Sequence, residues 1–274
     1  MSSDLATLTH AVAEIAARAA SAILEVYRSD FAIEHKDDRS PLTAADLAAH
    51  HVITHGLNAL TPGWPVLSEE SAAIGWSERS TWRRYWLVDP LDGTREFIRR
   101  NGEFTVNIAL IEEHRPVLGI VQTPVTGDLA SAWQGGGSWL ARGGAAPMRL
   151  VTRRRPSTLI VAGSRSHASQ REAAMLQRLG THEKHPLGSS LKFVRIAGGE
   201  ADLYLRLGAT SEWDTAAAQC VLDQAGGAVL DLAGNRLTYN ARDTLINPEF
   251  VAFGDANADW SALFGPGQRS KSAS

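Results

Sequence analysis

The stretch Tyr85–Ile111 reads YWLVDPLDGTREFIRRNGEFTVNIALI, and it contains two apolar runs separated by a polar connection. The first run, 85–88, is typical of a buried strand, and it ends abruptly at Asp89-Pro90-Leu91-Asp92-Gly93-Thr94. Proline fixes its own φ and lacks a backbone donor, whereas glycine allows a close backbone approach. The sequence therefore predicts a strand that delivers two carboxylates, three residues apart, into a tight turn.

Two carboxylates this close repel each other, so they need a compensating cation. Magnesium prefers hard oxygen ligands and usually keeps water and substrate phosphate in its coordination shell. The carbonyl of Leu91 can join Asp89 and Asp92 in that shell. An ordinary Asp-Pro turn, in which the carboxylates cap the backbone, is an equally good interpretation of this motif alone.

Two further acidic positions follow short apolar runs or begin a helix. Glu69 and Glu70 follow Pro65–Ser68, and Asp214 follows Trp213 at the start of a predicted helix. Taken singly, the first pair reads as a solvated loop and the second position as a helix N-cap. A two-metal phosphoryl-transfer site, however, requires carboxylates from several separate segments, such as these three positions at strand or helix ends.

Asp46 and Thr94 are candidates for activating water at such a site. Asp46 lies in the first turn of a predicted helix over 43–60, and from spacing alone a favourable interaction with the helix dipole is the better interpretation. Thr94 places a hydroxyl beside the two carboxylates of the turn. A hydroxyl held by a carboxylate can orient a water molecule and help to deprotonate it.

The predicted elements suggest two lobes. Helices are expected over 4–28, 43–60, 168–179, 189–198 and 214–225, and the segment 71–83 reads as irregular. The basic, proline-containing stretch 153–156 is the best boundary. It predicts an N-terminal α+β lobe over 1–152, a C-terminal α/β lobe over 153–264 and a disordered tail over 265–274.

Composition excludes several classes of protein. A net charge of −3 does not indicate the strongly basic surface that is typical of nucleic-acid-binding proteins. The single cysteine, Cys220, cannot form an intramolecular disulfide, which favours a reducing, cytoplasmic location. The amphipathic N-terminal segment does not read as a signal peptide, and no apolar run reaches the ~18 residues of a membrane span. Peripheral attachment to the inner membrane and the oligomeric state are left open. His50, His51 and His55 read as surface or packing residues.

Together, SEE at 68–70, DPLDGT at 89–94 and WDTAA at 213–217 resemble the signatures of the lithium-sensitive magnesium phosphatase superfamily that includes inositol monophosphatase. Within it, the segments 40–50, 65–70, 85–111, 164–167, 188–193 and 204–208 resemble the bacterial 3′(2′),5′-bisphosphate nucleotidases, and the similarity covers about residues 5–254. This resemblance implies a layered αβαβα sugar-phosphatase fold, of the α+β or α/β class. It also implies hydrolysis of adenosine 3′,5′-bisphosphate to AMP and phosphate, in sulfur assimilation and nucleotide recycling.

The resemblance also implies site residues and two or three Mg²⁺ ions. The ligands of one ion are matched by Glu69, Asp89 and the Leu91 carbonyl. Glu69 is also a candidate catalytic residue. Asp89, Asp92 and Asp214 match ligands of a second. The residues that match the water-activating pair are Asp46 and Thr94.

On the substrate side, the amides of Gly93 and Thr94 would hold the phosphate, with Asp214 also in contact. Ser189, Ser190 and Lys192 would contact the nucleotide or its second phosphate, with His167 and Arg206 as weaker candidates. Lys192 also reads as a solvated helix charge, and His167 as a helix cap. One departure from the family pattern is Ala218, which stands where glycine is usual.

Two alternatives to the bisphosphate nucleotidase stay open. The first is another substrate within the same superfamily, such as inositol monophosphate or fructose bisphosphate, because substrate pockets diverge on one fold. The second is a non-catalytic protein that binds magnesium or a nucleotide and acts as a regulator. The presence of Asp46 and Thr94 together with all metal stations favours an enzyme.

Overall fold

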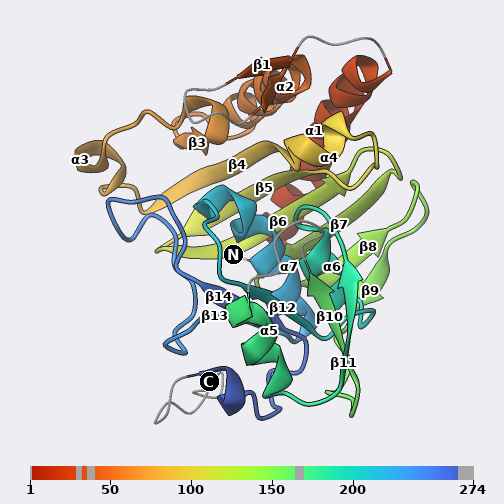
Figure 1. Ribbon diagram of the computed structural model, residues 1–274. Helices are drawn as coiled ribbons and strands as arrows, with labels where there is room; N and C mark the ends of the chain where they lie inside the picture. Colours follow the sequence, from red (N-terminus) through yellow and green to blue (C-terminus); the bar gives the residue numbers. More distant parts are fainter. Residues whose placement is uncertain (1, 29–32, 36–40, 164–169, 265–274) are drawn as a thin grey trace.

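The protein is described by a computed structural model over residues 2–28, 33–35, 41–163 and 170–264. Helices and sheets alternate in five layers (Figure 1). The larger sheet runs in the order β3 (Val66–Ser68), β4 (Arg84–Asp92), β5 (Thr105–Glu112), β6 (Arg115–Thr123), β7 (Asp128–Trp133), β8 (Gly137–Ala141) and β9 (Met148–Leu150). Its pairs are antiparallel except β3 with β4, so the carboxyl ends of β3 and β4 lie at the same edge.

The smaller sheet is mixed. Its order is β11 (His182–Pro186), β10 (Leu159–Gly163), β12 (Leu203–Arg206), β14 (Phe250–Phe253) and β13 (Ala228–Asp231). Strand β10 is parallel to both of its neighbours, whereas β14 is antiparallel to both of its own.

The helices form the other three layers. Helices α1 (Ser2–Tyr27) and α2 (Ala44–Leu60) pack on one face of the larger sheet through an apolar core with β4, β5 and β6. Helices α6 (Leu191–Ala197) and α7 (Ala216–Ala225) lie between the two sheets. Helix α5 (Gln170–Gln177) and the 3₁₀-helix η3 (Ser261–Leu263) cover the outer face of the smaller sheet. The predicted αβαβα arrangement is confirmed.

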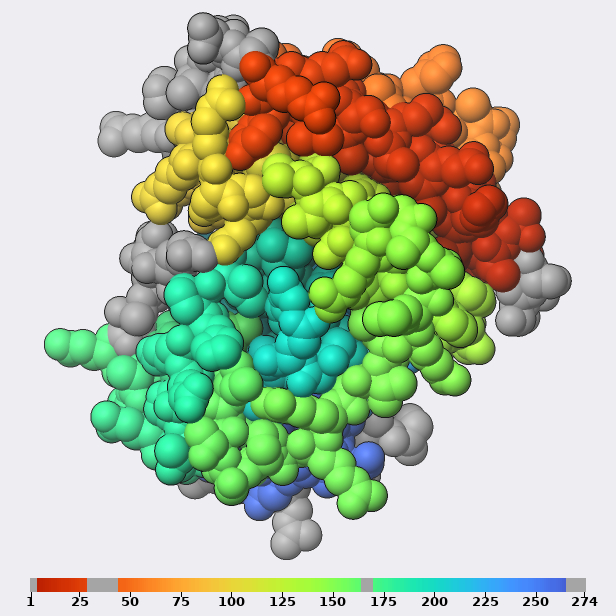
Figure 2. All heavy atoms as spheres, turned by 90° about the vertical axis from the view of Figure 1, so that its right-hand side faces the viewer, coloured from red at the N-terminus to blue at the C-terminus, as the bar shows by residue number. Residues whose placement is uncertain are grey.

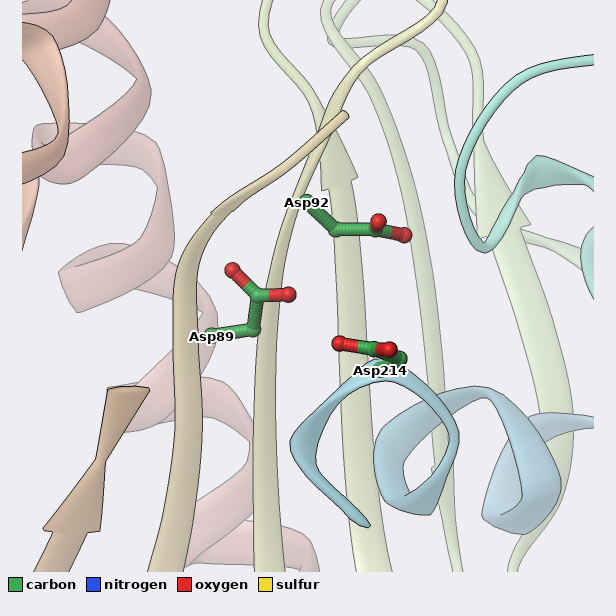
Figure 3. Close-up of side chains that lie close together, drawn as sticks. All are labelled: Asp89, Asp92 and Asp214. Atoms are coloured by element: carbon green, nitrogen blue, oxygen red, sulfur yellow. The ribbon is translucent and has the colours of Figure 1, made fainter. Parts of the chain in front are cut away.

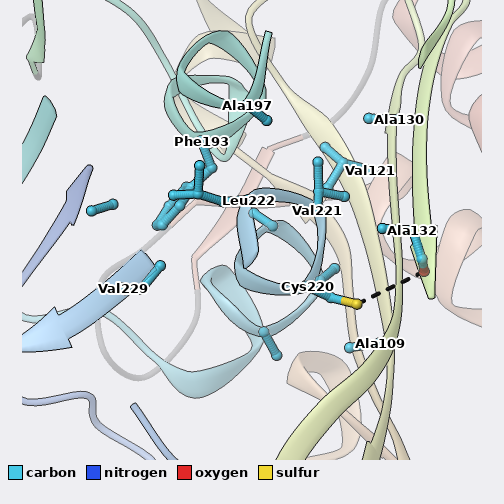
Figure 4. Close-up of a cluster of buried hydrophobic side chains, with 14 of the residues drawn as sticks. Ala109, Val121, Ala130, Ala132, Phe193, Ala197, Cys220, Val221, Leu222 and Val229 are labelled. Atoms are coloured by element: carbon cyan, nitrogen blue, oxygen red, sulfur yellow. Dashed lines mark hydrogen bonds between the residues drawn. The ribbon is translucent and has the colours of Figure 1, made fainter. Parts of the chain in front are cut away.

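Small residues let α7 lie close to the larger sheet. A Cβ atom at Gly119 of β6 would come within 2.2 Å of the Ala217 carbonyl oxygen, so any side chain there would push the helix away. On the facing side of α7, the Cys220 thiol donates to the Ala132 carbonyl at 3.8 Å (Figure 4). Cys220 is buried among apolar side chains, as predicted. This packing fixes α7, and with it the loop that leads into α7.

The side view in Figure 2 shows how the layers close on one another. Helix α1, in red, lies across the larger sheet, and the cyan part of the chain is recessed between the two sheets. Within the described ranges, no helix combines the length and apolarity needed to cross a membrane. The expected cytoplasmic location and peripheral attachment remain predictions.

The short elements differ most from the sequence prediction. Strand β4 continues beyond residue 88 to Asp92, and the structure adds β2 (Pro41–Thr43), α3 (Trp76–Arg79) and α4 (Thr94–Ile98), whereas β1 (Ile33–His35) falls where a short strand over 31–35 was expected. Of these, α3 falls in the segment expected to be irregular. Two 3₁₀-helices, η1 (Glu69–Ser71) and η2 (Glu212–Asp214), carry the other acidic stations. The division into lobes at 152 stays a prediction, since one core draws residues from both halves. The predicted tail lies outside the described residues.

Candidate active site

A β-bulge brings Asp89 and Asp92 to one side of β4. Asp89 pairs with Asn107 and Asp92 with Thr105, so three steps along β4 oppose two along β5. In a regular strand, side chains three residues apart point to opposite faces, and the extra residue of the bulge cancels this alternation. Figure 3 shows the two carboxylates from β4 turned toward that of Asp214, which comes from the end of η2.

The turn that follows β4 depends on glycine. Gly93 has a φ of 96°, in the left-handed region, and a Cβ atom there would lie 3.3 Å from the Glu103 carbonyl oxygen. The chain then enters α4 at Thr94, which is half-buried. The Leu91 amide donates to Asp89 Oδ1 at 3.0 Å, so one oxygen of this carboxylate is already tied to the turn.

Asp214 is held from two directions. The Ser211 amide donates to its Oδ2 at 2.8 Å, which fixes the carboxylate over the start of η2. Ser190 Oγ lies 2.8 Å from the Asp214 carbonyl oxygen and 3.1 Å from Asp92 Oδ2, and it accepts from Asn107 Nδ2 at 3.1 Å. Ser190 thus links the two acidic segments, and its single proton serves one acceptor at a time.

The three carboxylates of Asp89, Asp92 and Asp214 form one cluster. Each offers an oxygen, and these oxygens lie within 4.8 Å of one another. Burial raises the pKa of Asp89 well above its usual value, and the charges of Glu69, Asp92, Asp214 and Asp46 raise it further. Burial likewise raises the pKa of Asp214, with Asp92 and Glu69 adding to the effect.

This electrostatic arrangement fits a bound cation. Buried like charges are costly unless a counter-charge neutralises them. A divalent cation with oxygen ligands does so, and it keeps the carboxylates ionised at neutral pH. The donor set, oxygen only and highly charged, suits magnesium.

Glu69 and Asp46 lie close enough to act on Asp89 but stand outside the three-carboxylate cluster. Asp46 is only 1% exposed, although it lies in the first turn of a helix on the outside of the larger sheet. Its carboxylate is therefore buried, which is compatible both with the interaction with the helix dipole and with a place near the acidic cluster.

A cavity of about 180 Å³ adjoins the acidic cluster and carries basic groups on its other side. Lys192 is 6% exposed, donates to the Ser189 carbonyl oxygen at 2.8 Å and lies 5.1 Å from the centre of the Tyr204 ring. Burial lowers its pKa to about 8. Arg206 donates to the carbonyl oxygens of Gly208 and Ala209, at 3.1 and 2.9 Å.

The predicted substrate residues are not all in this cavity. Gly93, Ser189, Lys192, Arg206 and Asp214 line it. Thr94 and Ser190 do not line it, and Ser190 is 1% exposed and lies between the acidic segments. His167 lies outside the described residues.

Several residues of this region were not predicted from the sequence. Asn107 supports Ser190, and a single amide within the apolar run of β5 was a signal that could have pointed to it. Tyr204 and Arg95 line the cavity without having been singled out. His50, expected at the surface or in packing, has Nδ1 2.9 Å from the buried hydroxyl of Ser68, directly before Glu69.

A five-layer αβαβα fold with an acidic cluster at the end of a bulged strand, next to a basic cavity, defines a metal-dependent phosphatase. The chain belongs to the inositol monophosphatase family, which it matches over residues 4–260. Members of this family depend on a metal ion, typically magnesium.

The chain is 48% identical over 241 residues to the 3′(2′),5′-bisphosphate nucleotidase CysQ of Escherichia coli K12, covering 87% of this chain and 96% of the relative. It is 37% identical to CysQ of Haemophilus influenzae, with 94% and 96% covered. Among solved structures, CysQ from Bacteroides thetaiotaomicron has a TM-score of 0.80 at 35% identity, covering 90% of this chain and 97% of that one. An inositol monophosphatase from Anabaena shares the fold, with a TM-score of 0.69 at 21% identity and 92% of each chain covered.

Proposed function

We propose that this protein is a magnesium-dependent 3′(2′),5′-bisphosphate nucleotidase that hydrolyses adenosine 3′,5′-bisphosphate to AMP and phosphate. The observation that carries the proposal is the cluster of three carboxylates within 4.8 Å beside a cavity with two buried or half-buried cations. The names of the relatives at 37–48% identity agree with it.

The acidic residues would hold two or three magnesium ions. We assign Glu69, Asp89 and the Leu91 carbonyl to one ion, and Asp89, Asp92 and Asp214 to another. When bound, magnesium neutralises phosphate charge and lowers the pKa of coordinated water. The protein's own contribution is to hold these oxygens together against their repulsion, through the bulge of β4 and the Ser211 amide.

Asp46 and Thr94 would orient the attacking water and take up its proton. The buried carboxylate of Asp46 acts on the pKa of Asp89, which supports its nearness to the reacting centre. The water oxygen forms the new bond to phosphorus, the bond to the 3′ oxygen breaks, and that oxygen leaves with a proton. The amides of Gly93 and Thr94 would hold the transferred phosphate.

The basic side of the cavity would bind the second phosphate. Lys192 and Arg206 supply positive charge there, and Ser189 supplies a buried hydroxyl that has no hydrogen-bond partner among the described residues. A substrate with a single phosphate would leave the Ser189 hydroxyl without a partner and the charges of Lys192 and Arg206 without a counter-anion. This favours a bisphosphate over inositol monophosphate.

The test is product analysis with the purified protein. Adenosine 3′,5′-bisphosphate is incubated with magnesium or with excess EDTA, and nucleotides and phosphate are quantified. The proposal predicts equal amounts of AMP and phosphate with magnesium and none with EDTA. Stoichiometric binding without turnover would support the regulator instead, and adenosine 3′-phosphate as product would contradict the assigned position of attack.

A further inference from the structure

Arg79 is a buried cation that the proposed reaction does not use. It is 3% exposed and lies at the end of α3. Its Nη1 donates to Asn240 Oδ1 at 2.7 Å and to the Arg242 carbonyl oxygen at 3.1 Å, and its Nη2 donates to the Asp243 carbonyl oxygen. Burying a charge this deeply costs free energy unless the group is hydrogen-bonded. Here the acceptors belong to a loop more than 160 residues further along the chain.

Asn240 passes this contact on to η2. Its Nδ2 donates to the Arg79 carbonyl oxygen at 2.5 Å, and its own backbone amide donates to Glu212 Oε2 at 2.6 Å. Asn240 has a φ of 50°, and both Asn240 and Glu212 are 0% exposed. Glu212 is the first residue of η2, two residues before Asp214.

The same loop also holds η2 from the other side. The Glu212 amide donates to the Leu245 carbonyl oxygen at 2.8 Å. Asn247 Nδ2 donates to the Ser211 carbonyl oxygen at 2.7 Å and to Thr215 Oγ1 at 3.0 Å. Residues 240–247, which we call the strap, therefore contact the chain on both sides of Asp214.

We infer that Arg79 and Asn240 are positioning residues that fix Asp214 in the carboxylate cluster by holding the strap on η2. The inference rests on the proposed role of Asp214 as a metal ligand. Carboxylates within 4.8 Å repel one another, so a loosely held η2 would let Asp214 move away from Asp89 and Asp92. Rigid support from outside the ligand set keeps the cation site preformed.

Two variants test this inference. Arg79→Lys keeps the positive charge but loses the two-pronged guanidinium geometry. Asn240→Gly removes only the side chain, because glycine accepts a positive φ without strain. Arg83→Lys is the matched control, since Arg83 lies on the same segment, has an 83% exposed side chain and pairs with the exposed Glu113.

Magnesium binding is measured by calorimetry without substrate, and the magnesium activation constant and the KM for adenosine 3′,5′-bisphosphate are measured by kinetics. Loss of support around a metal ligand typically weakens metal affinity by about 10–100-fold. We expect Arg79→Lys and Asn240→Gly to raise the dissociation constant and the activation constant for magnesium by a factor in this range. The KM for adenosine 3′,5′-bisphosphate at saturating magnesium should stay nearly unchanged. Arg83→Lys should match the wild type. A purely structural role would lower only the unfolding temperature in EDTA.

Wild-type magnesium affinity in both folded variants would overturn the inference. If Arg79→Lys does not fold, Asn240→Gly decides alone. Asp214→Asn serves as the reference. If this variant binds magnesium like the wild type, the proposed metal site itself is wrong. If Asp214→Asn loses magnesium affinity and Asn240→Gly does not, only the role of the strap is contradicted.

Discussion

The acidic and the basic walls of the site are built differently, although Asp92 and Asp214 line the same cavity as Lys192 and Arg206. Asp89, Asp92 and Asp214 crowd like charges together, held by a strand bulge and a backbone amide. Lys192 and Arg206 sit on α6 and β12 and donate to carbonyl oxygens close by in the chain. The acidic wall repels phosphate until a cation arrives, whereas the basic wall offers its charge without metal. We therefore expect the acidic wall to control turnover and the basic wall to control selectivity.

The largest effect on turnover is expected from Asp89→Asn. Loss of a ligand from the acidic wall should lower kcat by about 10³-fold or more, equivalent to about 4 kcal/mol.

Because the pKa of Asp89 is raised by burial and by neighbouring carboxylates, its ionised form destabilises the metal-free protein at neutral pH. Asp89→Asn should therefore raise the unfolding temperature in EDTA. Asp128→Asn, at a half-buried position of β7 outside the acidic cluster, is the control for turnover; near-normal turnover of Asp89→Asn at saturating magnesium would remove Asp89 from the metal site.

Thr94→Ala separates water activation from metal binding. Removal of a group that assists proton transfer typically costs about 10²–10⁴-fold in rate. We expect a loss of kcat in this range with an unchanged magnesium activation constant, both measured by phosphate release. Thr94→Ser keeps the hydroxyl and should retain most of the activity. Equal losses in the alanine and serine variants would indicate a packing role instead.

Lys192→Ala tests the basic wall. It should raise the KM for adenosine 3′,5′-bisphosphate by about 10-fold, since a hydrogen bond to a charged group contributes about 1.5–3 kcal/mol. The KM for adenosine 3′-phosphate, which lacks the second phosphate, should change little. Equal effects on both substrates would exclude Lys192 from selectivity.

The protonation of Lys192 gives a related pH dependence. Burial lowers the pKa of Lys192 to about 8, so the side chain is charged below that pH and neutral above it. The kcat/KM for the bisphosphate should therefore fall as pH rises through about 8, and Lys192→Ala should remove this step from the profile measured between about pH 7 and 9. A step that persists in the variant would belong to another group.

The smallest effect is expected from Ala218→Gly, which introduces the glycine that the resemblance to the family implies at this position. Ala218 is 1% exposed within α7. Glycine costs about 1 kcal/mol in a helix interior, which corresponds to a drop of about 2–4 °C in the unfolding temperature. Turnover should stay close to that of the wild type. A large gain in turnover would mean that the alanine methyl group disturbs the site.

The sequence predicted the acidic wall better than the basic wall or its supports. Asp89, Asp92 and Asp214 stand within motifs a few residues long, so their chemistry is local. Strand β4 was expected to stop at residue 88 because Asp-Pro reads as a turn, and only pairing with β5 reveals the bulge.

Contacts between distant segments explain the rest of the differences. Ser190 was expected on the substrate, but its position depends on Asp92 and Asp214 from two other segments. Arg79 lies in a polar stretch with no pattern, and its partner Asn240 is 161 residues away in the sequence. No local signal connects the two, because the fold alone brings them together.

The different roles of the two walls are tested most directly by the ratio of kcat/KM for adenosine 3′,5′-bisphosphate to that for inositol 1-phosphate at saturating magnesium, with EDTA as the blank. We expect a ratio of at least about 10–100, because the second phosphate gains charge-assisted hydrogen bonds of about 1.5–3 kcal/mol. We also expect no release of phosphate from either ester in EDTA. A ratio near one, or a preference for the inositol ester, would contradict the role of the basic wall, and activity in EDTA would contradict that of the acidic wall.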